Sequence, residues 1–129
     1  MTSLSMERTA VTPEVRLDPG RAALLISGEC YPESPIPFFG QLFAAVQPHL
    51  AGRPVRLDVT LRLSYVNSAS TKGFRRLLLR LDEAAGMGTR VTVTWEYEVG
   101  DETIAELGND LAEGLHQLDF EPSTFEQAA

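Results

Sequence analysis

The chain has 129 residues, which is enough for one domain with a hydrophobic core. Hydrophobic residues make up 43% and charged residues 22%, as in soluble globular proteins, and no apolar run approaches the ~18 residues of a membrane-spanning helix. The formal net charge of −7 argues against a general nucleic-acid binder, so we expect neither a nucleic acid nor a membrane as a partner.

Charge is unevenly distributed along the chain. Residues 51–90 carry seven arginines and the only lysine, Lys72, against three acidic residues. Residues 91–129 carry ten acidic residues and no lysine or arginine. The basic middle of the chain could therefore serve an acidic protein partner or an added phosphate, or it could be a solvated helix face.

The first residues and the cysteine content indicate a cytoplasmic protein. Residues 1–7 lack the basic and apolar regions of a signal peptide, and the single cysteine, Cys30, fits a reducing compartment. Cys30, His49 and His116 show no metal-ligand spacing, and the chain has neither a phosphate-binding glycine loop nor a nucleophile elbow. We therefore expect no metal and no cofactor, and these motifs give no support to a hydrolase.

We expect a single domain over residues 1–129, with loose ends at 1–11 and 121–129. Residues 12–17 are typical of a short first strand, which a turn rich in proline and glycine joins to a second strand over 22–28. The second strand is a near-continuous apolar run, and this pattern predicts burial on both of its faces.

The loop after the second strand contains three prolines and leads into a first helix. Apolar residues recur at helical spacing over residues 39–46. Ser34 is expected to be the N-cap of this helix and Pro35 its first helical position. Pro48 and Gly52 mark the place where the helix is expected to stop.

A third strand is predicted over residues 55–63, where apolar and polar residues alternate, and the period then changes to that of a helix reaching about residue 85. A fourth strand over 90–97, a third helix that starts at 100–102 and a weak last strand over 115–120 follow. This order predicts an α/β fold with a mixed, mainly parallel sheet of about five strands and three to four helices packed on it.

The change from strand to helix occurs at residues 64–72, which form the main candidate site. A helix start leaves backbone N–H groups free, and a small hydroxyl residue there can cap the helix or carry a phosphate against its dipole. Ser68 or Ser70 is expected to be the cap. Lys72 and Arg76 stand off the apolar stripe of the helix, either as a solvated face or as partners of an anion.

Three segments become specific when they are taken together in order: GECYPES at residues 28–34, YVNSASTK at 65–72 and WEY at 95–97. They resemble the SiaC family of bacterial regulatory phosphoproteins, whose corresponding motifs are GESYPEN, YxNTSSxK and WxY followed by an acidic helix. The resemblance covers about residues 9–114. Each motif alone is weak, but the ordered set is specific.

This resemblance implies a fold similar to the STAS domains of anti-sigma-factor antagonists, and a switch protein rather than an enzyme. It places the phosphorylated residue at Ser68, where the family has threonine. It implies a cognate serine/threonine protein kinase that adds the phosphate and a PP2C-type phosphatase that removes it. It also implies that the unphosphorylated form binds and activates a diguanylate cyclase, in cyclic-di-GMP signalling that controls biofilm formation or aggregation.

Ala69 and Cys30 also depart from the family, which has serine at both positions. The candidate partner-binding or phosphate-adjacent residues around Ser68 are Tyr31, Pro32, Glu33, Tyr65, Asn67, Ser70, Thr71, Lys72 and Arg76. Two other functions stay open at this point. One is an anti-sigma-factor antagonist that acts on transcription, and the other is a small ligand-binding module that uses the loop from Tyr31 to Pro37.

Overall fold

Each strand of the sheet is hydrogen-bonded to the next strand in the chain, so the sheet keeps the order of the sequence. The computed structural model describes residues 3–126. The strands are β1 (Leu4–Met6), β2 (Glu14–Asp18), β3 (Ala23–Cys30), β4 (Arg56–Val66), β5 (Arg90–Glu98) and β6 (Asp119–Phe125). The helices are α1 (Ile36–Ala51), α2 (Ser68–Gly86) and α3 (Glu102–Ala112), and a short 3-10 turn, η1 (Pro19–Arg21), lies between β2 and β3. The predicted α/β class is confirmed.

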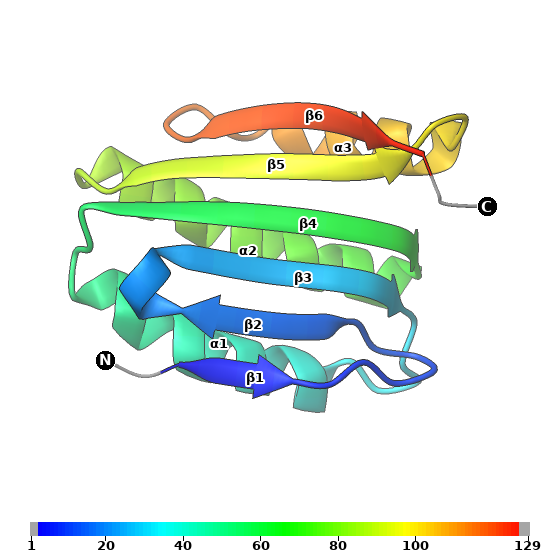
Figure 1. Cartoon of the computed structure of the whole chain (residues 1–129), viewed down its shortest axis with the longest axis horizontal. Coiled ribbons are helices and arrows are strands. Elements are labelled where there is room, and N and C mark those ends of the chain that lie inside the picture. Colours follow the sequence, from blue (N-terminus) through cyan, green and yellow to red (C-terminus); the bar gives the residue numbers. More distant parts are fainter. Residues whose placement is uncertain (1–2, 127–129) are drawn as a thin grey trace.

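The three α-helices cover one face of the sheet (Figure 1), and the connections between the strands explain why. β1, β2 and β3 are antiparallel neighbours, whereas β3, β4, β5 and β6 are parallel and are joined through α1, α2 and α3. Crossovers between parallel strands are right-handed, and each one here moves to the next strand in the same direction. Every helix therefore arrives on the same face, and within residues 3–126 no helix covers the other face.

The core lies between the sheet and the helix layer. β4 alternates buried and solvent-facing residues, and its four inward residues are at most 3% exposed: Leu57, Val59, Leu61 and Leu63. α2 contributes residues at helical spacing to the same buried cluster: Phe74, Leu77, Leu78 and Leu81. The strand period before residues 64–72 therefore belongs to β4, and the helical period after them belongs to α2. These two elements meet in the core.

β3 is buried on one face only, contrary to the prediction. Leu24 and Ile26 point into the core and are almost fully buried, whereas Ala23 and Leu25 on the other face are half-buried. The apolar run is real, but its outer residues lie on the face of the sheet that has no helix within the described chain. Neighbouring side chains on the sheet shield them only in part.

The sheet has six strands where about five were expected, because the amino-terminal segment that was expected to be loose contains β1. Leu4 lies opposite Leu17 and Met6 lies opposite Val15 in the antiparallel pairing of β1 with β2. A strand of three residues is too short for a period of two to be recognised in the sequence. It forms because pairing with β2 covers the edge of the core.

The other end that was expected to be loose, 121–129, is also partly ordered, since β6 continues to Phe125. β6 is an edge strand, and a proline fits there because an outward-facing position needs no N–H donor. Pro122 lies opposite Trp95 of β5. The parts of the predicted loose ends at 1–2 and 127–129 lie outside the described residues.

α1 departs from the sequence prediction at its start and agrees with it at its end. Pro35, with helical backbone angles (φ −75°, ψ −16°), occupies the N-cap, and no side chain caps the helix. The prediction of Ser34 as the N-cap is therefore wrong. The helix continues past Pro48 to Ala51, and Gly52 is its C-cap, so it ends within the predicted stretch from Pro48 to Gly52. A proline removes one helix hydrogen bond and bends the chain locally. Because Pro48 lies near the end of α1, only the last turn of the helix is affected.

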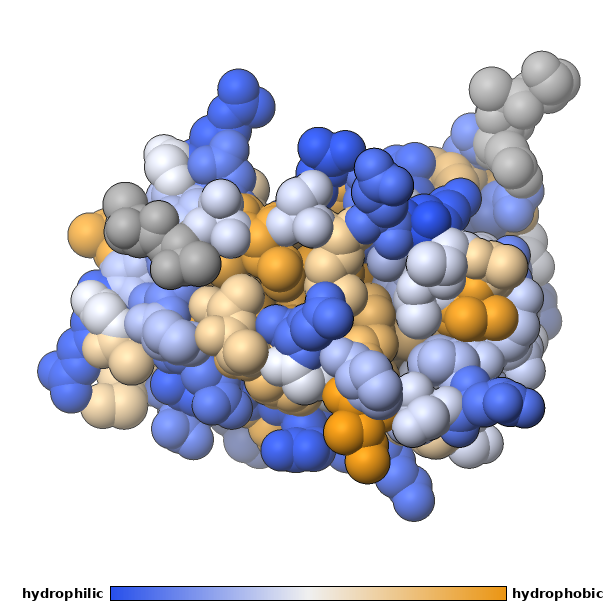
Figure 2. All heavy atoms as spheres, turned by 90° about the horizontal axis from the view of Figure 1, so that it is seen from below, coloured by the Kyte–Doolittle hydropathy of each residue, from blue (hydrophilic) through white to orange (hydrophobic). Residues whose placement is uncertain are grey.

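Figure 2 shows the molecule from the side on which β1 and α1 lie, where hydrophobic residues gather in the middle of the surface between hydrophilic margins. The cover over the core is thin on this side, because the edge strand is only three residues long. Leu4, Met6 and Phe43 pack against the core but stay partly exposed. This side is therefore more apolar than the open face of the sheet, where charged residues alternate along β2 and β4.

α3 is held on β5 by one buried aromatic side chain. Trp95 is 1% exposed, and its Nε1–H donates to the carbonyl oxygen of Ile104 at 2.9 Å. Gly108 lies directly against the indole ring, so that a Cβ at this position would overlap it. A glycine inside α3 is thus explained by close packing rather than by flexibility.

Asp82 of α2 ties the segment before β6 to the helix layer. Its Oδ1 accepts backbone N–H groups of His116, Gln117 and Leu118 at 3.1, 2.8 and 3.0 Å. Burial tends to raise the pKa of the Asp82 carboxyl, but these hydrogen bonds, aided by the charge of His116, outweigh burial and hold the pKa below its ordinary value. The carboxylate therefore acts as a fixed acceptor for a turn that has few other partners.

We expect Asp82→Ala to lower the free energy of unfolding at neutral pH by about 1.5–3 kcal/mol, because hydrogen bonds to a charged acceptor are lost. Glu83→Ala is the matched control. Glu83 is the next residue of α2 and is mostly exposed, and its contact with Arg80 at 3.8 Å is a surface ion pair worth little. Urea denaturation of the wild type and both variants measures the difference.

The same comparison has a pH dependence whose sign follows from the lowered pKa of Asp82 in the folded protein. The stabilisation is complete above the unfolded pKa of about 3.9 and is lost as the pH falls through the folded pKa. The wild type and Asp82→Ala should therefore converge in stability as the solution is acidified. A gap that stays constant down to the acid transition would contradict this role.

Candidate functional site

α2 begins at a side-chain cap provided by Asn67. This residue has extended backbone angles (φ −80°, ψ 170°), and its Oδ1 accepts the backbone N–H of Ser70 at 2.9 Å. The N–H and the hydroxyl of Thr71 both donate to the carbonyl oxygen of Asn67, at 2.9 and 3.0 Å. The prediction that Ser68 or Ser70 caps the helix is therefore wrong: Ser68 is the first helical residue.

The three hydroxyl residues of the first turn differ in accessibility. Ser68 is exposed, Thr71 is half-buried with its hydroxyl bonded to the backbone, and Ser70 is fully buried. The helical period explains the difference, because Ser70 lies one turn before Phe74 on the core side of α2. Ser68 is thus the one hydroxyl of this turn that a second protein can reach freely.

The buried Ser70 faces the end of β3. Its Oγ makes no hydrogen bond of good geometry to any described residue, and it lies near the thiol of Cys30. Cys30 is the last residue of β3 and is 0% exposed. Burial raises the pKa of this thiol, and the Ser70 hydroxyl lowers it by a smaller amount. Cys30 is therefore a neutral core residue rather than a nucleophile.

The loop after β3 lies beside the start of α2, where parallel strands bring their carboxyl ends together. Asn67 joins the two segments, since its N–H donates to the carbonyl oxygen of Cys30 at 3.1 Å and its Nδ2–H to that of Pro32 at 3.4 Å. Tyr31 and Tyr65 meet edge to face, with ring centroids 5.5 Å apart. The predicted residues of the loop and of the junction are thus one cluster in space.

Glu33 is less tightly involved. Its side chain is exposed, and among the described residues no hydrogen bond or ion pair holds it. Tyr65 is also 52% exposed, although one side of its ring is covered by Tyr31. Tyr65, Glu33 and Ser68 are therefore each accessible to a partner.

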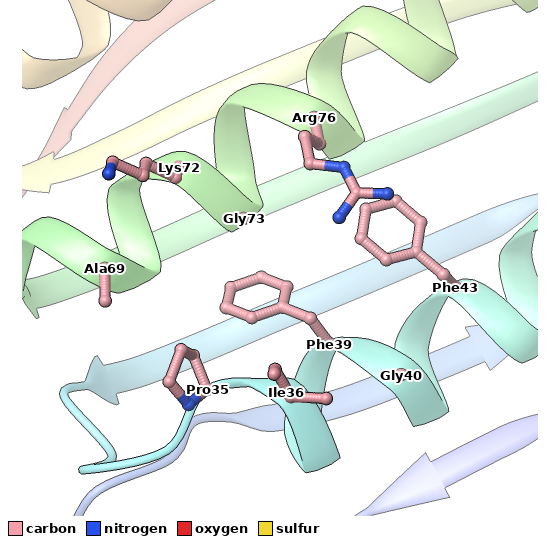
Figure 3. Close-up of a pocket in the computed structure, with 9 residues that line it drawn as sticks. All are labelled: Pro35, Ile36, Phe39, Gly40, Phe43, Ala69, Lys72, Gly73 and Arg76. Carbon is pink, nitrogen blue, oxygen red and sulfur yellow. The ribbon is translucent and has the colours of Figure 1, made fainter.

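A groove of about 330 Å³ lies between α1 and α2 (Figure 3), and its lining includes Ala69, the residue after Ser68. Figure 3 shows Arg76 of α2 reaching toward Phe43 of α1, whereas the Lys72 side chain extends along α2, away from the aromatic rings. The lining residues are Pro35, Ile36, Phe39, Gly40, Phe43, Ala69, Lys72, Gly73 and Arg76. Two of the predicted site residues, Lys72 and Arg76, are therefore part of a concave surface rather than of a flat helix face.

Sequence reasoning missed the contribution of α1 to this groove. Phe39 packs edge to face on Phe74 with centroids 5.1 Å apart, and its ring lies directly over Gly73 of α2. A Cβ at Gly73 would overlap the ring. The available signal was the pair of glycines inside helical patterns, Gly40 and Gly73, because an interior helix glycine usually marks a close approach.

Two arginines of α2 lie in different environments. The guanidinium of Arg76 lies over the ring of Phe43, 5.2 Å from its centroid, whereas Arg80 pairs with Glu83 at 3.8 Å. Among the described residues, neither Lys72 nor Arg76 forms an ion pair. The groove therefore carries uncompensated positive charge along one side.

Metal and membrane sites find no support in the described chain. Within residues 3–126, no three histidine, cysteine, aspartate or glutamate side chains come together as metal ligands would. No helix there is long and apolar enough to cross a membrane. The chemistry of the candidate site is accordingly that of a hydroxyl group, aromatic rings and two cations.

Comparison with known proteins gives a consistent result. A family model described as SiaC family regulatory phosphoprotein matches residues 6–125. An uncharacterised protein of Pseudomonas aeruginosa (strain UCBPP-PA14) is 34% identical over 113 residues, which is 88% of this chain and 90% of that protein.

Solved structures agree with this match. A structure of SiaC of Pseudomonas aeruginosa has a TM-score of 0.88 at 30% identity, covering 97% of this chain and 100% of the other. The crystal structure of the diguanylate cyclase SiaD in complex with its activator SiaC, from the same organism, contains a chain with a TM-score of 0.88 at 32% identity. That match covers 95% of this chain and 99% of the other.

The capping geometry predicts different effects for two neighbouring residues. Asn67→Ala should lower the free energy of unfolding by about 0.5–2 kcal/mol, because the N–H of Ser70 loses its acceptor. Ser68→Ala is the control and should change stability by less than about 0.5 kcal/mol, as expected for an exposed residue outside the cap. Thermal or urea denaturation measures both, and a larger loss for Ser68→Ala than for Asn67→Ala would contradict the assignment of the cap.

Proposed function

Because the chain belongs to the SiaC family of regulatory phosphoproteins, we propose that it is a non-enzymatic switch whose unphosphorylated form binds and activates a diguanylate cyclase. The observation that carries this proposal is the complex of a SiaC with the diguanylate cyclase SiaD, in which the SiaC chain has the fold of this protein over nearly its whole length. The downstream signal is then cyclic-di-GMP, which links the protein to biofilm formation or aggregation. The same complex favours a cyclase over a sigma-factor pathway as the target.

Ser68 is the proposed phosphorylation site. It is exposed, it is the first residue of α2, and it stands beside backbone N–H groups at the positive end of the helix dipole. A phosphate there carries about −1.5 to −2 charges at neutral pH, which these groups and Lys72 one turn later can accommodate. A cognate serine/threonine kinase would add the group, and a PP2C-type phosphatase would remove it.

The switch acts by changing which surfaces can meet. A neutral hydroxyl can be covered by a partner at little cost, whereas a phosphate in the same interface has to be desolvated. The hydroxyl is not part of the helix cap and holds no other described residue in place, so its modification leaves the cap intact. We therefore expect phosphorylation to control docking without unfolding the domain.

The first test concerns the phosphoacceptor. Incubation with the cognate kinase and ATP, followed by peptide mass spectrometry, should place the phosphate on Ser68, because Ser70 is buried and the hydroxyl of Thr71 is bonded to Asn67. Ser68→Ala should abolish labelling. Ser70→Ala is the control and should be labelled like the wild type. Phosphate that persists on Ser70 or Thr71 in Ser68→Ala would contradict the assignment.

The second test concerns the output. Unphosphorylated protein and Ser68→Ala should bind the diguanylate cyclase of the same organism and raise its rate of cyclic-di-GMP synthesis. Ser68→Asp should bind at least about tenfold more weakly, since about 1.4 kcal/mol of desolvation or repulsion is enough for that loss. Calorimetric titration gives the affinities, and product formation by the cyclase gives the activation.

A matched control introduces the same charge elsewhere. Thr103 is exposed in the first turn of α3, so Thr103→Asp adds a carboxylate to a helix start outside the candidate site. It should bind and activate like the wild type. Equal affinities for Ser68→Asp and Ser68→Ala, with both proteins folded, would rule out a switch at this position.

A further inference from the structure

The groove between α1 and α2 has a regular construction. Each helix lines it with four residues at i, i+3, i+4 and i+7: Ile36, Phe39, Gly40 and Phe43 from α1, and Ala69, Lys72, Gly73 and Arg76 from α2. This spacing means that the two helices face each other across the groove over two turns, or about 11 Å. Figure 3 shows both rows of residues, with the aromatic rings of α1 between them.

Each row has a glycine at its centre, and the two glycines act differently: Gly73 lets the helices approach closely, and Gly40 leaves the hollow open. The space above Gly73 is filled by the ring of Phe39, which forms the floor of the groove. The space above Gly40 is empty, since a Cβ built there meets no atom within 4 Å. The groove is therefore open to an incoming side chain on the α1 side, and a substitution at Gly40 can fill it without disturbing the fold.

The walls of the groove are apolar and one end is unusually exposed. Ile36 is 78% exposed, in the first turn of α1. Phe43 is half-buried and lies under the guanidinium of Arg76. Apolar side chains that line a hollow gain most when a partner covers them, because each square ångström removed from water is favourable.

The α2 side of the groove adds a charge requirement. Lys72 and Arg76 are exposed, and neither has an acidic partner among the described residues. A surface with apolar walls and two cations along one side complements an amphipathic helix with apolar residues on one face and carboxylates beside them. A helix of the partner could also pack against α1 and α2 as helices commonly pack, with its side chains in the groove between them.

We propose that this groove is the docking site of the cyclase, and that it receives an acidic amphipathic helix of that partner. Apolar side chains of the helix enter the hollow above Gly40 and Phe39. Its carboxylates meet Lys72 and Arg76. This inference rests on the proposed function, because it names the part of the surface through which the switch meets its target.

The position of Ser68 gives the groove a role in the switch. Ser68 and Lys72 are separated by one turn of α2, so their side chains are neighbours on the helix surface. A phosphate on Ser68 would attract the ammonium group of Lys72 and would repel carboxylates at the same end of the groove. Phosphate and partner therefore compete for one cation.

The groove is tested by filling it. Gly40→Leu should fold with at least wild-type stability, because leucine favours the helix more than glycine and its Cβ would meet open space. It should bind the cyclase at least about tenfold more weakly than the wild type, because the hollow is no longer available. Gln47→Leu adds the same side chain at an exposed position of α1 outside the groove, and it should bind like the wild type.

The charges are tested by pairs of neighbours. Arg76→Gln should weaken binding, and Arg75→Gln should not, since Arg75 is exposed on the same helix but does not line the groove. Competition for Lys72 also predicts that Ser68→Asp and Lys72→Gln are not additive. Ser68→Asp should weaken binding less in the Lys72→Gln protein than in the wild type.

A second arm does not depend on the cyclase. A synthetic acidic helix of leucine and glutamate, with leucines at i, i+3, i+4 and i+7, should shift the NMR amide signals of Gly40, Lys72 and Gly73. The control peptide, with lysine in place of glutamate, should shift them less. Signals that move elsewhere, or not at all, would overturn the groove as a site for such a helix.

The outcomes separate the two proposals. If the wild type does not bind the cyclase but the acidic helix maps to the groove, the cyclase is wrong both as target and as occupant, and only the preference of the groove for an acidic helix stands. If the wild type binds the cyclase and Gly40→Leu binds equally well, the groove is wrong and the function stands. Gel filtration tests whether a second copy of this chain occupies the groove instead. If the wild type is a dimer that Gly40→Leu dissociates, and cyclase binding is unchanged, the groove is an interface between two copies and the inference is overturned.

Discussion

The candidate site depends on the hydrogen bonds of one side chain, the amide of Asn67. Its oxygen caps α2 through the N–H of Ser70, and its nitrogen reaches the carbonyl of Pro32 in the loop after β3. These contacts set the residue at which the helix starts, and the start sets the rotation of every later residue. Ser68 is turned to solvent and Ser70 to the core because the cap lies at Asn67. The cap thus decides which hydroxyl a kinase could reach.

The same rotation aligns the charges with the groove. Counting from the cap, Ala69, Lys72, Gly73 and Arg76 fall on the side of α2 that faces α1. The distance between the two helices is set by contact of the Phe39 ring with Gly73, where a methyl group would not fit. A single close contact therefore produces both the floor of the groove and the position of its cations. The proposed phosphate on Ser68 would stand one turn before Lys72 and would connect this surface to the state of Ser68.

The layering of the fold makes this surface available. Successive right-handed crossovers bring all helices to one face, so α1 and α2 are neighbours in the layer. The other face of the sheet carries alternating charged residues such as Arg56, Asp58 and Arg62, which suits a solvated surface. The two faces differ in kind: one has helix ends, aromatic rings and a groove, and the other has paired charges such as Arg62 with Glu96.

The sequence by itself determined the order of the main elements and indicated the candidate site, because both inferences rest on short-range periods and motifs. The alternation before residue 64 and the helical spacing after 72 located the junction, and the ordered motifs pointed to the family and to Ser68. The tertiary structure decided which side chain caps α2, since serine and asparagine are both good caps and only the neighbouring loop favours Asn67. It also decided that Leu4–Met6 forms a strand and that α1 and α2 enclose a groove, because strand pairing and helix packing join residues far apart in the chain. Local sequence patterns do not reveal contacts between residues that lie far apart in the chain.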